Sequence, residues 1–248
     1  MQNLQLTLDR VAENLALDEA LLDAAEANEI KSDVLRLWEL PTYCVVLGRS
    51  SSAEIEVDLA SCREDAVPVL RRASGGGTIV AGPGCMMYTL VLSLNEDCES
   101  PPIDQTHRFV LEKVSAALTT SNFQVYPAGI SDLAGRFAVT APLQKFSGNA
   151  MRLKRRHLLY HGTLLYDFDL SRISRWLAKP TRVPQYRSER AHADFVTNLP
   201  FDRSVLTQRL LTCWQAEQPL TDWPRQATTK ITNAKYGEGA PWAIHIPD

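Results

Sequence analysis

The stretch RRASGGGTIVAGPGCMMYTLVLSL, residues 71–94, places two arginines and three consecutive glycines directly before a long apolar run. The last part of the run, Tyr88–Leu94, is rich in residues that favour β-strands, which predicts a strand near the middle of a sheet. The glycines allow positive φ angles and put no Cβ between the backbone and a ligand. We therefore expect a ligand-binding loop at the mouth of a core strand.

The chemistry of this loop favours an anionic ligand. Successive exposed N–H groups form a concavity that attracts anionic oxygens, and the guanidinium groups of Arg71 and Arg72 suit a carboxylate or a phosphate. A β-hairpin connection that merely tolerates glycine is an equally simple explanation. The spacing matches neither the P-loop nor the dinucleotide-binding pattern.

Composition limits the class of protein. The chain has 248 residues, of which 45% are hydrophobic and 22% charged, as in an ordinary globular domain with a real core. A net charge of −3, with basic residues clustered only at residues 152–156 (RLKRR), gives no sign of nucleic-acid binding. Five cysteines without paired spacing argue against a disulfide framework or a zinc site. The acidic start and the lack of a long apolar segment predict a cytoplasmic protein that does not associate with membranes.

Residue periodicity predicts strands interrupted by only a few helices. Helices are expected over residues 14–30, 103–120 (with Phe109, Val110, Val114 and Leu118 inward) and 203–215. Strands are expected over residues 34–40 (with one buried face), 44–50, 67–70, 88–94, 146–151 and 161–167. This pattern predicts an α+β domain built around one mixed sheet.

A second stretch, QKFSGNAMRLKRRHLLYHGTLLYDFD, residues 144–169, carries further candidate groups. Lys145 opens a strand-like segment, where its ammonium could contact a carbonyl oxygen and a phosphate together. Most lysines are solvated surface residues, however, and a lone histidine such as His161 more often packs or hydrogen-bonds than acts as a base. Each feature is weak alone, and their combination is informative.

Four motifs occur in order: RRASGGGT, SDL at residues 131–133, KFSGNAMR at 145–152 and HGTLL at 161–165. Together with LALDEALL, LRLWELPTYCVVLGRS and FVTNL at 195–199, they closely resemble the lipoate–protein ligase group of the biotin/lipoate ligase and acyltransferase superfamily. The resemblance implies a mixed sheet flanked by helices, of the biotin/lipoate ligase, class II synthetase-like type. It also implies a single catalytic domain over residues 1–248, without the full C-terminal accessory domain of the longer bacterial ligases.

The resemblance implies a reaction in two steps and assigns residues to it. ATP would activate lipoate as lipoyl-AMP, and a lysine of an acceptor domain would then take the lipoyl group. Lys145 would be the catalytic residue, Arg72 would contact the acyl-adenylate, and Asp132 would lie near the phosphates, plausibly through magnesium. The implied substrate- and nucleotide-binding residues are Arg71, Arg72, Ser74, Gly75, Gly76, Gly77, Thr78, Ile79, Val80, Asp132, Lys145, Ser147, Gly148, Ala150, His161, Gly162 and Thr163.

Partners and departures follow from the same resemblance. Lipoyl-accepting domains are often acidic, so the basic cluster 152–156 would steer them, unless it is only a solvated hairpin tip. A separate protein could supply an accessory domain. Ala81 stands where many relatives have histidine, which predicts an altered pocket wall. The segment 186–195 could either contact substrate or only pack.

Two other functions remain open. An ATP-independent octanoyl or lipoyl transferase would need a nucleophilic cysteine shortly before Lys145, and residues 128–144 contain none. Cys85 is the remaining candidate, although a small buried residue there needs no catalytic role. A non-catalytic binding relative would not need Arg72, the glycines and Lys145 together. A biotin ligase is also conceivable, but the glycine–arginine loop that is characteristic of biotin ligases is missing from this sequence.

Overall fold

An eight-stranded mixed sheet forms the centre of the computed structural model, which describes residues 1–94, 102–178, 185–187, 190 and 192–246. β1 is parallel to both β11 and β2, and the remaining neighbours are antiparallel. In order across the sheet, the strands are β11 (Gln218–Pro219), β1 (Gln2–Gln5), β2 (Val34–Trp38), β6 (Cys85–Ser93), β10 (His157–Leu165), β9 (Gln144–Leu153), β8 (Asp132–Arg136) and β7 (Gln124–Ala128). The apolar run after the glycines thus forms the inner strand β6, as predicted.

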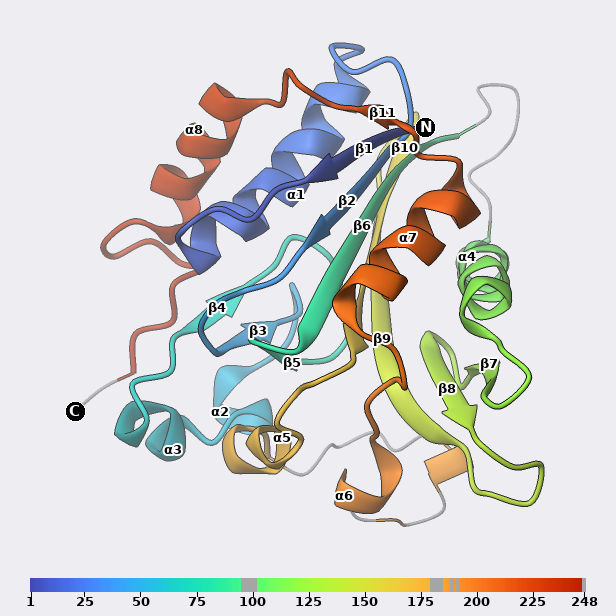
Figure 1. The fold of residues 1–248 in the computed structure, drawn as a ribbon. Helices are drawn as coiled ribbons and strands as arrows, with labels where there is room; N and C mark the ends of the chain where they lie inside the picture. Colours follow the sequence, from blue (N-terminus) through green and yellow to red (C-terminus); the bar gives the residue numbers. More distant parts are fainter. Residues whose placement is uncertain (95–101, 179–184, 188–189, 191, 247–248) are drawn as a thin grey trace.

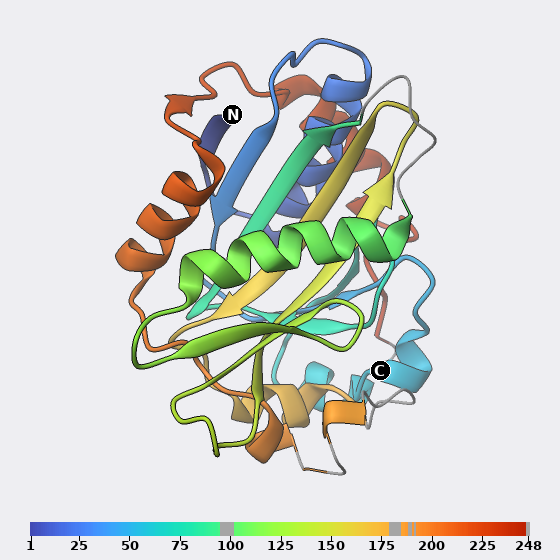
Figure 2. The same ribbon diagram turned by 90° about the vertical axis from the view of Figure 1, so that its right-hand side faces the viewer.

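Helices cover both faces of this sheet (Figures 1 and 2). On one face lie α1 (Val11–Glu26) and α8 (Arg225–Tyr236), and on the other lie α4 (Ile103–Leu118) and α7 (Arg203–Trp214). Leucines of α1 pack with residues of β2, β6 and β10, whereas apolar residues of α4 and α7 pack on the opposite side of the same strands. Full burial of each such side chain contributes about 1.5–3 kcal/mol.

Two predicted details of burial are wrong, one in β2 and one in α4. Every residue of β2 is buried, so the strand has two covered faces rather than one. In α4, Val110, Val114 and Leu118 are buried as predicted, but Phe109 is 56% exposed. The buried stripe of the helix is centred on Val110, and one residue along a helix turns the side chain by about 100°.

A second, three-stranded sheet carries the glycine loop. Its order is β4 (Val69–Arg71), β3 (Cys44–Leu47) and β5 (Ile79–Ala81), and the loop joins β4 to β5. The single sheet predicted from the sequence is therefore two sheets, which share a core cluster that includes Trp38 and Met87 of the larger one. The short elements around it are α2 (Ala53–Glu56), α3 (Leu59–Glu64), α5 (Ser171–Trp176), the 3-10 helix η1 (Gln185–Arg187) and α6 (His192–Phe195).

The basic cluster 152–156 lies against the acidic side of α1. Arg152 Nη1 lies 2.5 Å from Glu19 Oε1, and Lys154 Nζ lies 2.6 Å from Asp23 Oδ1. These pairs fasten the β9–β10 hairpin to the helix and use part of the charge that was predicted to steer an acceptor. Among the described residues, no helix is long and apolar enough to cross a membrane.

Candidate active site

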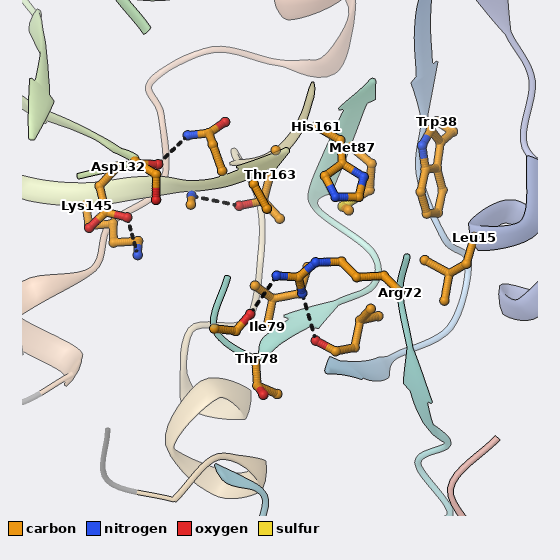
Figure 3. Close-up of a pocket in the computed structure, with 17 residues that line it drawn as sticks. Leu15, Trp38, Arg72, Thr78, Ile79, Met87, Asp132, Lys145, His161 and Thr163 are labelled. Carbon is orange, nitrogen blue, oxygen red and sulfur yellow. Dashed lines mark hydrogen bonds and ion pairs between the residues drawn. The ribbon is translucent and has the colours of Figure 1, made fainter. Parts of the chain in front are cut away.

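A pocket opens between the two sheets and collects most of the predicted residues (Figure 3). Residues from both glycine-rich motifs and from both sheets line it. Of the predicted residues, those that line it are Arg72, Gly77, Thr78, Ile79, Asp132, Lys145, Gly148, Ala150, His161, Gly162 and Thr163. Those that the described lining does not include are Arg71, Ser74, Gly75, Gly76, Val80 and Ser147. The two motifs, far apart in the sequence, therefore form one site.

One end of the pocket is apolar. Leu15, Trp38, Val46 and Met87 line it, and Figure 3 shows Leu15 and Trp38 on the opposite side of the view from Lys145. The indole N–H of Trp38 is buried and has no hydrogen-bond partner within the described residues. Leu15 lies in the motif LALDEALL and Trp38 in LRLWELPTYCVVLGRS, and no role was predicted for either. The pocket thus has an apolar end and a charged end.

The charged end is an ion pair between Lys145 and Asp132. Lys145 Nζ lies 2.6 Å from Asp132 Oδ1, and their side chains are 31% and 11% exposed. An irregularity in the pairing of β8 with β9 creates this arrangement. Lys145 pairs with Ala134 and Ser147 with Leu133, so that Phe146 is an extra residue on β9. Such bulges redirect the neighbouring side chains.

Gly148 gives the Lys145 side chain its space. A Cβ at Gly148 would lie 3.3 Å from Lys145 Nζ, which is closer than most real Cβ contacts, and 3.5 Å from its Cε, which is an ordinary contact. The glycine of the motif therefore accommodates the catalytic candidate itself.

Arg72 organises the glycine loop from behind. Its Nη2 donates to the carbonyls of Gly75 and Gly77 at 2.6 and 2.9 Å, its Nη1 to Val46 O at 3.2 Å and its Nε to Ser74 Oγ at 3.0 Å. Burial lowers the pKa of Arg72 to about 10, with the charge of Glu56 opposing, so the group stays charged at neutral pH. After these contacts only one Nη1 hydrogen is left for a ligand.

The amides of the glycine loop have no protein acceptor within the described residues. Arg72 contacts the loop through the carbonyls of Gly75 and Gly77. Gly75, Gly76 and Gly77 are all exposed. Across the described residues, none of these three amides donates to another protein atom. Gly76 has a φ of 83°, a conformation that side chains rarely adopt. Free, clustered amides are the donors expected of an anion-binding loop.

Arg71 has a different task from the one predicted. Its Nη1 donates to the carbonyls of Gly48 and Ser51 at 2.8 and 2.7 Å and more weakly to Arg49 O at 3.3 Å. These contacts hold the turn after β3 and place Arg71 outside the described pocket lining. The turn and the glycine loop are joined further, since Arg49 N donates to Ser74 O at 2.8 Å.

A buried polar network connects the loop to α1. Ser74 Oγ lies 2.5 Å from His161 Nε2, and His161 Nδ1 lies 3.5 Å from Asp18 Oδ2. Asp18 in turn pairs with Arg36, whose Nη1 lies 2.6 Å from Asp18 Oδ1. Burial alone would raise the pKa of Asp18, but Arg36 and His161 together lower it below its ordinary value. His161 therefore holds the loop in place as well as lining the pocket.

The remaining predicted positions have structural contacts. Thr78 donates its N–H and its Oγ1–H to Glu56 Oε2, at 3.2 and 2.6 Å, so Glu56 is a residue that was not predicted from the sequence.

Ala81 is 1% exposed and packs in the core, which does not support the predicted change in the pocket wall. Asn149 is a further missed residue, and its Nδ2 donates to Ser131 O at 2.8 Å to hold the SDL turn against β9.

Cys85 does not have the environment of a nucleophile. It is fully buried in β6, and burial raises the pKa of its thiol far above the ordinary value. A nucleophilic cysteine needs the opposite, an exposed site that stabilises the thiolate. Among the described cysteines, Cys44 and Cys62 are also buried, and Cys213 is partly exposed on α7.

These features define a domain that places an apolar pocket wall, a lysine and a glycine loop together. Residues 10–210 match the family model described as "Lipoyl protein ligase A/B catalytic domain". The chain therefore belongs to this family, as the motifs predicted.

Relatives agree with this assignment. A protein of Mycoplasma genitalium named "Probable lipoate-protein ligase A" is 30% identical over 164 residues, which are 66% of this chain and 45% of that protein. The "Octanoyltransferase LipM" of Clostridioides difficile is 24% identical over 193 residues, 73% of this chain and 69% of that protein. The chain thus spans less than half the length of the Mycoplasma relative.

Solved structures show the same fold. The bi-partite lipoate protein ligase of Thermoplasma acidophilum, described with its E2 lipoyl domain, has a TM-score of 0.80 at 20% identity and covers 100% of this chain and 97% of its own. A lipoate-protein ligase A bound with ATP has a TM-score of 0.76 at 20% identity, with 98% of this chain and 97% of its own covered. The predicted α+β fold, a mixed sheet flanked by helices, is confirmed.

Proposed function

We propose that this chain is the catalytic part of an ATP-dependent lipoate–protein ligase. It would activate lipoate as lipoyl-AMP and transfer the lipoyl group to a lysine of an acceptor domain. The observation that carries the proposal is the position of Lys145, at the charged end of an apolar pocket whose wall continues into the glycine loop. One site then has a place for an acyl tail, a cation for the reacting atoms and free amides for phosphate oxygens.

The apolar end suits the acyl tail. Leu15, Val46 and Met87 would remove the hydrocarbon chain from water, at about 0.8 kcal/mol for each buried methylene. Trp38 would close this end around the ring of lipoate. The carboxylate of the acid would then point to Lys145, because charged groups avoid an apolar wall.

Lys145 would act in both steps. In the first, the lipoate carboxylate oxygen attacks the α-phosphorus of ATP, a P–O bond forms, and the bond to the β-phosphate breaks to release pyrophosphate. In the second, the acceptor amine attacks the carbonyl carbon, the bond to AMP breaks, and the amine loses its proton. Negative charge grows on the α-phosphate and then on the carbonyl oxygen, and a fixed ammonium stabilises both.

The glycine loop would hold the nucleotide. The amides of Gly75, Gly76 and Gly77 are exposed, and such amides bind phosphate oxygens without a charged side chain. Arg72 would contribute mainly by fixing the loop, since most of its donors bind loop carbonyls and neighbouring groups. The predicted direct contact of Arg72 with the adenylate would be limited to one hydrogen.

The described residues do not form a magnesium site of their own. Within the described residues there is no group of three histidine, cysteine or acidic side chains that could hold a metal. Both oxygens of Asp132 accept from protein donors, Oδ1 from Lys145 and Oδ2 from Tyr186. Magnesium at Asp132 would share the carboxylate with these two donors, and we assign no step to it.

Pyrophosphate release tests the proposal. Wild-type protein should release pyrophosphate from ATP only when lipoic acid is present, and Lys145→Ala should lower the rate by about 10²–10³, as for other charge-stabilising donors. Lys230→Ala, which removes an exposed lysine of α8, should leave the rate unchanged. Wild-type protein that releases no pyrophosphate, yet transfers octanoate from an acyl-carrier protein, would favour the transferase instead.

The second step is tested with a lipoyl domain as acceptor. A bi-partite ligase and its E2 lipoyl domain are the subjects of the related Thermoplasma structure, so we propose the same kind of acceptor here. Lipoyl-AMP formation without transfer to the domain would point to a separate accessory protein. Transfer by this chain alone would show that no such protein is needed.

A further inference from the structure

Asp132, the partner of Lys145, has a second donor that the sequence analysis did not predict. The hydroxyl of Tyr186 in η1 donates to Asp132 Oδ2 at 2.8 Å, while Lys145 Nζ lies 2.6 Å from Oδ1. Each carboxylate oxygen thus has one fixed donor. Tyr186 belongs to the segment 186–195, whose role the sequence left open.

Both the ring and the backbone of Tyr186 have fixed contacts. The ring packs on Phe195, with ring centroids 5.1 Å apart. The backbone carbonyl of Tyr186 accepts from Arg190 Nη2 at 2.7 Å. Arg190 also donates from Nη1 to Leu143 O at 2.9 Å, next to the start of β9. These contacts give the hydroxyl a defined position.

The same segment is joined to the backbone of Lys145. Thr197 N donates to Lys145 O at 2.8 Å, and Val196 forms a parallel bridge with Lys145. Phe195 and Val196 are both buried. Tyr186 therefore reaches Asp132 from a piece of chain that is fixed to the same strand as the lysine.

The chemistry of the contact suits a positioning role. Burial raises the pKa of Tyr186 above its ordinary value, and the charge of Asp132 and the hydrogen bond to it act in the same direction. The phenol stays protonated at neutral pH and is a permanent donor. A carboxylate held at one oxygen can still rotate about its side-chain bonds, whereas one held at both cannot.

We propose that Tyr186 positions Lys145 through Asp132, so that the ammonium keeps a fixed place at the charged end of the pocket. Its effect on catalysis rests on the proposed ligase function, whereas the effect on the lysine itself does not. Tyr186 does not line the pocket among the described residues, so it acts through Asp132 and not on substrate.

Kinetics of Tyr186→Phe test the role in catalysis. This variant keeps the ring that packs on Phe195 and removes only the hydroxyl. We expect kcat for lipoate-dependent pyrophosphate release to fall about five- to twentyfold, with KM for ATP and lipoate within twofold of wild type. Tyr126→Phe, which removes the hydroxyl of a half-buried residue that accepts from Arg136 Nη2 at 3.5 Å, should change neither.

A double-mutant cycle separates a direct role from one through Asp132. In an Asp132→Asn background, Tyr186→Phe should have less than a twofold further effect on kcat. Losses that multiply in the double variant would overturn the proposal, because Tyr186 would then act independently of Asp132.

Acylation of the ligand-free protein tests the same proposal without any enzyme activity. Trace labelling with acetic anhydride, read by mass spectrometry, should modify Lys145 several-fold faster in Tyr186→Phe than in wild type, because an ammonium held on a carboxylate is protected. Lys113 and Lys230 should be labelled equally in both proteins. Unchanged labelling of Lys145 would refute the proposal, whether or not wild type releases pyrophosphate. Wild type without pyrophosphate release but with faster labelling in the variant would refute only the ligase function.

Discussion

Replacing Arg72 with lysine would keep a positive charge behind the glycine loop but remove the fork that holds it. The Nη2 atom of Arg72 binds the carbonyls of Gly75 and Gly77 at 2.6 and 2.9 Å, and its Nε binds Ser74 Oγ. A lysine ammonium is a point charge on a flexible stem and cannot satisfy these acceptors together. We expect the three glycines to lose their fixed orientation, while the pocket beyond the loop stays intact.

The size of the effect follows from the order that the loop would have to regain on binding. Fixing one backbone residue costs about 1–2 kcal/mol, so ordering the three glycines would cost at most about 3–6 kcal/mol. The new lysine can still bind one carbonyl, and a hydrogen bond to a charged group is worth about 1.5–3 kcal/mol. ATP binding should therefore weaken by about 1.5–3 kcal/mol, which is about ten- to hundredfold in Kd.

Isothermal titration measures this directly, with ATP and with lipoate as separate ligands. Arg72→Lys should weaken ATP binding by the stated factor and change lipoate binding less than threefold. Arg63→Lys, at an exposed position of α3, serves as the matched control. If ATP binding stayed within twofold of wild type and lipoate binding fell tenfold, Arg72 would act on the acyl substrate and the reasoning from the loop would be wrong.

Three further predictions concern single side chains. Gly148→Ala places a Cβ 3.3 Å from Lys145 Nζ, so pyrophosphate release should slow about tenfold while urea unfolding shifts by less than about 1 kcal/mol; an unchanged rate would contradict this. Cys85→Ser should retain at least half of the wild-type ligase rate, because the buried thiol takes no part, and loss of all activity without unfolding would show otherwise. The pKa of Asp18 is lowered in the folded protein, so its pair with Arg36 stabilises the fold at pH values above 3.8, the ordinary pKa of the carboxyl group. This stabilisation is lost as the pH falls through the lower pKa of the folded state. Asp18→Asn should therefore cost more unfolding free energy at pH 6 than at pH 3, and a cost that grows on acidification would contradict the argument.

The long elements were predictable from the sequence because each has a strong period or an uninterrupted apolar run. β6 is buried along almost its whole length, and α4 repeats buried residues at helical spacing. The weaker elements were missed for the opposite reason. β7 contains Pro127 and ends beside Gly129, and β5 has only three residues, so neither gives a pattern that stands out from a loop.

The site was predictable as a set of motifs but not as a set of contacts. The glycine loop and the lysine motif do meet, as the motif order suggested. Sequence could not show that Arg72 turns away to Val46 and the loop carbonyls, because those partners are defined only when β3 packs beside β4. Nor could it show Tyr186 beside Asp132, since 54 residues separate them.

Within the described part of the chain, the four cations in or beside the pocket are used differently. Arg71 and Arg72 bind mainly backbone carbonyls, and Arg36 is fully buried against Asp18. Lys145 alone of these four combines an exposed fraction of 31% with a position in the pocket. Its pair with Asp132 does not block this use, because an ammonium has further hydrogens beyond the one that the carboxylate takes. In the proposed reaction those hydrogens would contact a carbonyl oxygen and a phosphate oxygen, and fixing the first on Asp132 would determine where the others point.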